Sequence, residues 1–174
     1  MDSINSTKLN VMKALTELLQ TVVPVPGVHD FDLSNAVFRG RAVFSDTSDP
    51  VPLVSLLENL RPSDSRYAGY GKTGIRTEFE IIVQGWVKDD KVNPTDNAYE
   101  LLFVVENKLA EVINNGSTSA FPSVSSNPNY MLGGMIESMS IGDGICRPPD
   151  PQVSSKAFFF LPITVVITRE IGVS

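Results

Sequence analysis

A glycine-rich loop with one lysine is the first stretch of this sequence whose residue types suggest chemistry. Gly69-Tyr70-Gly71-Lys72-Thr73-Gly74 ends like a phosphate-binding loop, in which backbone N–H groups and a lysine hold phosphate oxygens. The first glycine of that motif would have to be residue 66, which is Arg66. The residues after the loop alternate like a strand, whereas phosphate binding needs a helix N-terminus there. We therefore interpret the loop as a connection between strands, not as a nucleotide site.

Paired carboxylates suggest a second chemistry, general acid/base catalysis. Glu78 and Glu80 lie two residues apart in an alternating run, which places them on one strand face about 7 Å apart. No pocket residues converge on them in the sequence, so a strand that faces solvent or an interface explains them better. Asp89, Asp90 and Asp143 have no run of ligands at the spacing of a calcium loop.

The single cysteine and the single histidine exclude further classes of site. One cysteine, Cys146, excludes an internal disulfide framework and a cysteine-based zinc site, and we expect a small half-buried residue in a strand. One histidine, His29, argues against a histidine metal site or a catalytic triad, and we expect a loop residue. The sequence has no nucleophile elbow, metal-binding helix motif or dinucleotide fingerprint. It predicts a protein that is not an enzyme and that needs no metal or cofactor.

Length and charge narrow the class of protein further. The 174 residues suit one domain, residues 1–174, and a hydrophobic content of 42% suffices for a core. The net charge of −6 argues against a general nucleic-acid-binding surface, which needs clustered Lys and Arg. No signal-peptide pattern begins the chain, and the longest apolar stretch, residues 157–167, is too short for a bilayer. We expect a soluble protein made in a reducing compartment, without a membrane partner.

Hydrophobic periodicity predicts the elements that position these residues. Amphipathic patterns favour two helices, the first capped by Asn5 or Ser6 and the second capped by Asn93 with Pro94 at its first position. Alternating or continuous apolar runs favour five strands. The fold class is therefore α+β, with a mixed or antiparallel sheet of about five strands packed by two helices, and with long loops at residues 59–74 and 116–130. The expected helices span residues 6–23 and 94–113, and the expected strands span residues 36–44, 53–58, 75–88, 131–145 and 157–170. The fourth of these strands is expected to be interrupted at Gly133-Gly134.

The strand expected at residues 75–88 is unusually long. At roughly 3.3 Å per residue it would reach about 45 Å, so it either bends at Gly85 or projects as one arm of a hairpin. Trp86 falls on the side opposite the main apolar face. Two placements for Trp86 remain open, under a helix or at an interface.

Interface residues are expected where aromatic and arginine side chains fall on strands and loops. Pro162 cannot donate a ladder hydrogen bond, so the last strand is expected at a sheet edge or a bulge, covered by another subunit. Arg39 and Arg41 flank Gly40 and are expected to share one strand face, either solvated or paired with an acidic partner. The expected contact residues are Arg39, Arg41, Tyr67, Tyr70, Lys72 and Trp86, with Phe158 and Phe160 at a subunit boundary.

The order of these elements resembles that of the tail terminator (tail completion) proteins of long-tailed bacteriophages. The resemblance covers nearly the whole chain and rests on element order, size and local texture. It is carried above all by residues 76–86 leading into the helix at 94–112, and by the closing strand at 158–169. It implies a sheet packed by two helices, assembled as a homohexameric ring.

The family further implies a structural virion protein, in the tail or neck, assembled in the host cytoplasm. Such a ring caps the tail tube, ends tail polymerisation and forms the joining surface for the head connector. Its partners would be itself, the tail tube protein, and sheath and neck or connector proteins, while DNA passes through the channel without specific binding. Two alternatives stay open: another phage neck or baseplate component of related fold, and a small-molecule-binding or enzymatic α+β domain.

Overall fold

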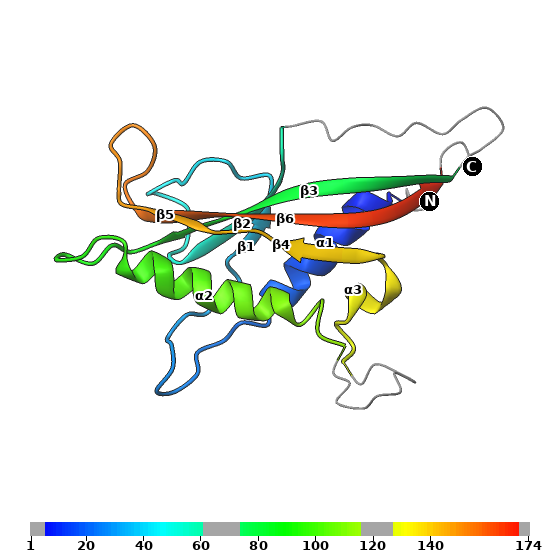
Figure 1. Cartoon of the computed structure of the whole chain (residues 1–174). Helices are drawn as coiled ribbons and strands as arrows, with labels where there is room; N and C mark the ends of the chain where they lie inside the picture. Colours follow the sequence, from blue (N-terminus) through cyan, green and yellow to red (C-terminus); the bar gives the residue numbers. More distant parts are fainter. Residues whose placement is uncertain (1–5, 61–73, 116–126, 171–174) are drawn as a thin grey trace.

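The protein is a mixed β-sheet with helices on one side, which confirms the α+β class (Figure 1). The computed structural model describes residues 6–60, 74–115 and 127–170. Within them the sheet has six strands, where about five were expected, and a one-turn helix accompanies the two expected ones. The helices are α1 (Thr7–Leu19), α2 (Asp96–Ala110) and α3 (Met131–Gly134), and the strands are β1 (Val37–Arg39), β2 (Leu53–Glu58), β3 (Gly74–Val87), β4 (Ser138–Ile141), β5 (Ile145–Arg147) and β6 (Ala157–Glu170).

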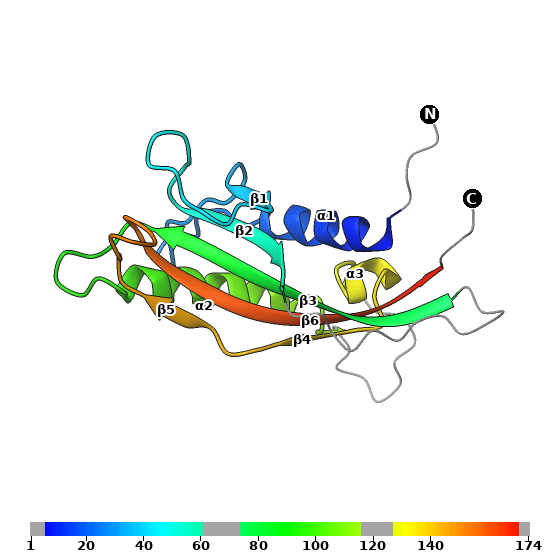
Figure 2. The same ribbon diagram turned by 90° about the horizontal axis from the view of Figure 1, so that it is seen from above.

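The two longest strands, β3 and β6, form the middle of the sheet. The strand order is β1-β2-β3-β6-β4, and β5 also pairs with β6. Only β1 and β2 run parallel; the other pairs are antiparallel. β3 and β6 pair along all of their length, from Gly74 opposite Glu170 to Val87 opposite Ala157. Figure 2 shows this ribbon continuing past β2 and β4, so β3 is one arm of a two-stranded projection.

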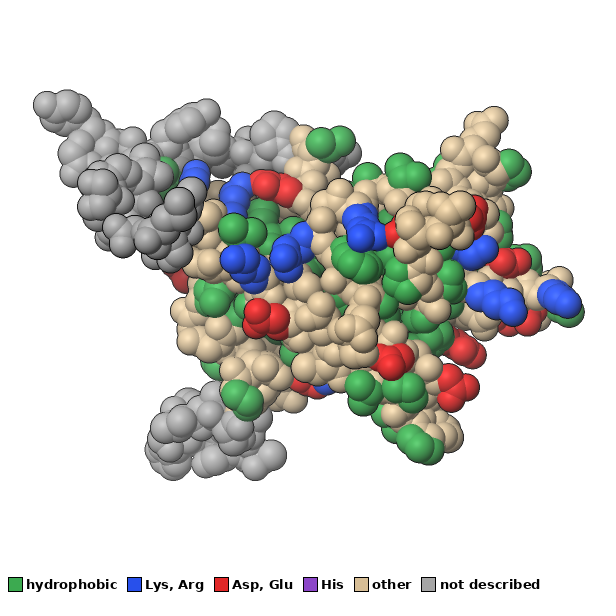
Figure 3. All heavy atoms as spheres, turned by 180° about the vertical axis from the view of Figure 1, so that it is seen from behind, with side chains coloured by type: hydrophobic (Ala, Val, Ile, Leu, Met, Phe, Trp, Pro, Cys, Tyr) green, Lys and Arg blue, Asp and Glu red, His purple; other side chains and the backbone are tan. Residues whose placement is uncertain are grey.

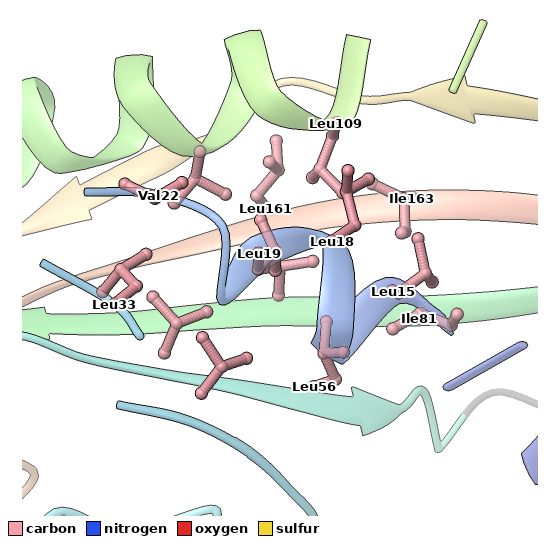
Figure 4. Close-up of a cluster of buried hydrophobic side chains, with 14 of the residues drawn as sticks. Leu15, Leu18, Leu19, Val22, Leu33, Leu56, Ile81, Leu109, Leu161 and Ile163 are labelled. Carbon is pink, nitrogen blue, oxygen red and sulfur yellow. The ribbon is translucent and has the colours of Figure 1, made fainter. Parts of the chain in front are cut away.

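Helices α1 and α2 lie side by side on one face of the sheet and enclose the main core. The apolar stripe predicted for α1 is buried at Val11, Leu15, Leu18 and Leu19. Alternation in β3 places Phe79, Ile81 and Val83 on the same face, as expected from the period of two. Figure 4 shows side chains of α1 and α2 meeting those of β2, β3 and β6 between the layers, among them Leu15, Leu19, Leu56, Ile81, Leu109, Leu161 and Ile163.

The structure confirms the expected N-cap of the first helix but not that of the second. Ser6 caps α1, since its hydroxyl accepts a hydrogen bond from the Leu9 N–H at 3.4 Å. The expected cap at Asn93 is wrong, because the Asn93 N–H donates instead to the Asp90 carboxylate in a turn, at 2.7 Å. Thr95 holds the N-cap position of α2. Both helices also end earlier than expected, at Leu19 and Ala110.

Three strand predictions need correction. The first strand stops at Arg39, because Gly40 adopts φ +77° and turns the chain away from β2. Residues 131–145 do not form one strand, since residues 131–134 all have positive φ and form α3, and β4 and β5 follow as separate strands. The predicted span 157–170 of the last strand is confirmed, but its edge position is wrong.

Pro162 is accommodated by a break in the pairing next to β6. β4 pairs with β6 as far as Ile163, and β5 begins pairing at Phe160, so Pro162 faces the connection between them. There the Pro162 carbonyl accepts a hydrogen bond from the Gly142 N–H at 2.8 Å. No paired strand residue lies on that side of Pro162, so the N–H that proline lacks leaves no ladder hydrogen bond unmade. The chain itself therefore covers the aromatic run on β6, which needs no second subunit for that purpose.

Candidate interaction surface

The sheet face away from the helices, here called the open face, is a candidate interaction surface. Aligned residues of neighbouring strands form rows across it, since paired residues point to the same side. The rows are apolar and aromatic at one end and polar at the other. From one end to the other they are Leu53–Trp86–Phe158–Arg147, Ser55–Gln84–Phe160–Ile145, Leu57–Ile82–Pro162, Glu80–Thr164–Ser140, Glu78–Val166–Ser138 and Arg76–Thr168.

An aromatic cluster occupies the apolar end of the open face. Phe44, Leu53, Trp86 and Phe158 are its buried members, with Phe38 and Phe160 packed against them. The Trp86 side chain is 1% exposed, and the ring of Phe44 lies 6.1 Å from it. Neither placement considered for Trp86 is found: it lies under the loop of residues 41–49, not under a helix, and it has no surface left for a partner.

Arg41 holds that loop on the cluster. Its guanidinium lies 3.6 Å from the centre of the Phe38 ring and forms an ion pair with Asp49, whose side chain is almost completely buried. The Arg41 N–H donates to the Ser55 hydroxyl at 3.0 Å, and the Ser45 N–H donates to the Asp49 carboxylate at 2.7 Å. Arg41 thus has an acidic partner as anticipated, but one within its own chain.

Arg39 does not share a face with Arg41, which corrects the expectation from the sequence. The positive φ of Gly40 separates the two side chains. Arg39 donates from Nη1 to the Thr16 hydroxyl of α1 at 3.0 Å, on the helix side of the sheet. Arg41 lies over Phe38, on the open side.

Phe160 keeps part of its surface on the open face. Its ring packs edge-on against the buried Phe158 at 5.4 Å, and its neighbour on β5 is Ile145, which is 61% exposed. In the next row Leu57, Ile82 and Pro162 are each only half-buried. A flat, partly apolar surface of this kind suits protein contact.

The other end of the open face is charged. The Arg76 guanidinium donates to the Glu137 carboxylate at 2.7 Å, and the Thr168 hydroxyl donates to the same carboxylate. These contacts, the one from Thr168 first, lower the pKa of Glu137 from its usual value. Glu78 and Glu80 point to this face together, as the alternation predicted.

A groove on the helix side of the molecule is a second candidate site. It lies between α2 and the turn Val25–His29, has a volume of about 360 Å³, and is lined by Val28, Phe103 and Lys108, among others. Val28 is 72% exposed and Phe103 is 61% exposed. The sequence signals were the apolar residues beside Pro26-Gly27 and the departure of Phe103 from the buried stripe of α2, and neither was recognised. His29 lies in this turn, as expected for a loop residue.

Cys146 is half-buried in β5, which confirms its predicted environment. Burial, and then the nearby charge of Glu106, raises the pKa of its thiol to about 11. Burial and the charge of Asp143 in turn raise the pKa of Glu106. Among the described residues, no three His, Cys, Asp or Glu side chains are placed to hold a metal ion.

Three expected contact residues, Tyr67, Tyr70 and Lys72, lie outside the described residues, as does most of the glycine-rich loop. In the part of the chain that is described, every helix is too short or too polar to cross a bilayer. The structure thus gathers Arg41, Trp86, Phe158 and Phe160 into one cluster and leaves Arg39 apart from it.

The chain matches no protein-family model, and a search of curated proteins finds no match either.

Proposed function

We propose that this chain is a structural virion protein that caps the tail tube of a long-tailed phage. As a terminator it ends tail polymerisation and forms the surface to which the head or neck connector joins. It acts in the tail or neck of the virion as a ring of six copies, after assembly in the host cytoplasm. Its partners are its own copies, the tail tube protein, and sheath and connector proteins, and DNA passes through the ring without specific binding.

The observation that carries the proposal is the arrangement of layers. Two long amphipathic helices cover one face of a mixed sheet, in the chain order that the resemblance to tail terminators implies. The opposite face keeps a half-buried apolar row, Leu57–Ile82–Pro162, beside Phe160 and Ile145. An assembly protein needs such surface for its neighbours, because bound partners are recognised through partly apolar faces with polar rims.

Gold labelling of virions tests where the chain acts. An epitope-tagged copy supplied to its phage should place the label at the head-proximal end of the tail. Label at the distal end would exclude the terminator role and favour the alternative baseplate role. Label on the neck, together with tails of normal length in a phage that lacks the chain, would favour another neck component.

A small-molecule-binding domain is the second candidate, favoured by the groove beside α2. Its volume of about 360 Å³ falls within the range of ligand sites. A thermal-shift screen with metabolites and nucleotides checks it, because a ligand that binds only the folded state raises Tm. Reproducible stabilisation that is abolished by Phe103→Ser would support this function, and the exposed position of Tyr99 on the same helix makes Tyr99→Ser the matched control.

A further inference from the structure

The edge of the molecule formed by α1 and β1 carries cations that lack an acidic partner in the described structure. Lys13 is exposed on α1, one turn before Thr16, and Arg39 is exposed on β1 with the Thr16 hydroxyl as its hydrogen-bond partner. Neither forms an ion pair with a described residue, unlike Lys8 and Arg41 beside them. Figure 3 views the molecule from behind and shows several Lys and Arg side chains across this side, with Asp and Glu side chains among them. The part that carries Lys13 and Arg39 is here called the basic edge.

The opposite edge carries acids without a basic partner. Glu106 is half-buried on the side of α2 that faces β5, and Asp143 is exposed in the connection between β4 and β5. No described Lys or Arg forms an ion pair with either. The two carboxylates repel each other, so the pKa of Glu106 is raised by burial and by the charge of Asp143. Glu106 and Asp143 define the acidic edge. A cation from another molecule would offset the repulsion between their carboxylates.

The two edges cannot neutralise each other within one chain. β1 is the first strand of the sheet and β4 and β5 flank its far side, so the basic and acidic edges face in opposite directions. Figure 2 shows α1 and β1 on one side of the β3–β6 ribbon and β4 and β5 on the other. Surfaces that are complementary and face apart join head to tail, and head-to-tail contacts close into rings when the rotation allows.

Net charge favours such local complementarity. Each copy carries a formal charge of −6, so copies brought together at random repel one another. A contact that sets cations of one copy against acids of the next offsets this repulsion and selects one orientation.

We propose that the basic edge of one copy, with Lys13 and Arg39, binds the acidic edge of the next copy, with Glu106 and Asp143. The partner is a second copy of this chain, and the contact is heterologous. This rests on the ring form of the proposed function and adds which surfaces join. Two charges oppose it locally, Glu17 on α1 and Arg147 on β5, and the contact must leave both in solvent.

A charge-swap series measured by light scattering over a range of protein concentrations tests the contact. Lys13→Glu reverses one of the two cations of the basic edge, and Asp143→Lys reverses one of the two acids of the acidic edge. Each should raise the dissociation constant for self-association about tenfold, the effect of one attractive pair made repulsive. Both residues are exposed, and neither side chain forms a hydrogen bond or an ion pair with a described residue, so the fold should be retained, which Tm verifies.

The two restorations are the decisive outcomes. A chain with both substitutions again sets opposite charges against each other at positions 13 and 143, and it should associate like the wild type. A mixture of the two single variants should also associate, with the two chains alternating. Stronger variants, Lys13→Glu with Arg39→Glu and Glu106→Lys with Asp143→Lys, should enlarge both effects, and about 0.5 M salt should weaken them all.

Two results would overturn the inference. One is a wild-type chain that stays monomeric up to about millimolar concentration, the range of the weakest specific contacts. The other is self-association that the single substitutions leave unchanged or that the double substitution does not restore. If a ring forms equally well in the charge variants, the assignment of the two edges is wrong. The terminator role is tested separately, by tail length and label position.

Discussion

The ring of Phe159 lies directly over the backbone of Gly85, its partner across β3 and β6. A Cβ placed on Gly85 would approach Phe159 Cε1 to 2.2 Å, far inside van der Waals contact. Phe159 is completely buried in the main core under the helices. The glycine therefore serves close packing, and the ladder between β3 and β6 continues through it without interruption.

Replacing Gly85 with alanine should overpack this site. We expect Gly85→Ala to lower the free energy of unfolding by about 1–3 kcal/mol, measured by urea denaturation. Gly74→Ala is the matched control, because a Cβ at Gly74 in the same strand meets no atom within 4 Å. Equal stability of the two variants would show that Phe159 moves aside at no cost.

The Arg41–Asp49 pair should keep the loop of residues 41–49 closed over Trp86. Asp49→Ala removes the acceptor of Arg41 and of the Ser45 N–H, and we expect a loss of about 1–2 kcal/mol, limited by the partial exposure of Arg41. Trp86 is the only tryptophan, so its emission should shift to longer wavelength as the loop opens. Ser48→Ala, at an exposed position of the same loop, should leave the emission unchanged. An unshifted spectrum for Asp49→Ala would mean that the aromatic contacts alone close the loop.

Cys146 should react slowly with thiol reagents at neutral pH. Its pKa of about 11 lies above the reference value of 9.0, so the folded state disfavours the thiolate. This preference stabilises the folded state fully below about pH 9 and is lost as the pH rises towards 11. The modification rate measured against pH should rise through this range, and Glu106→Gln should move the curve to lower pH. A midpoint near or below 9 would contradict the described environment.

Glu137 should titrate below its usual pKa. The hydrogen bond from Thr168 is the largest single cause, followed by the hydrogen bond from Arg76, whose charge adds to it, so Thr168→Val and Arg76→Gln should each raise the pKa of Glu137. Because the folded pKa is depressed, the contribution to stability is present above the unfolded value of 4.5 and is lost as the pH falls through the folded one. Carboxyl NMR titration measures each shift. A variant that leaves the pKa of Glu137 unchanged would show that the substituted side chain does not hold this carboxylate.

Local pattern predicted the long elements well, because their signal is carried by many residues. The span of β2 was predicted without error, and β3 was shifted by one residue from the expected range. Alternation also assigned Phe79 and Glu78 to opposite faces correctly. Such patterns reflect burial on one face, which is a property of the strand itself.

Neighbour relationships between distant segments could not be predicted in the same way. The sequence shows that Pro162 lacks an N–H, which suggested an edge strand. Only the fold shows that the gap between β4 and β5 lies beside Pro162, so that the strand need not be at the edge. The turn at Gly40 replaced strand where alternation suggested it, and the interruption expected at Gly133 and Gly134 is a left-handed turn. The aromatic cluster brings together residues as far apart as Phe38 and Phe160. From the sequence, Trp86, Phe158 and Phe160 were therefore named individually but were not joined to Phe38 and Phe44 in one site.

Tail length in the absence of this chain is the most direct measurement of the central claim. Electron microscopy of lysates from a phage that lacks the chain should show tails of uncontrolled length and heads without joined tails. Supplying the wild-type chain should restore one tail length. Normal virions with tails of uniform length in its absence would contradict the terminator role.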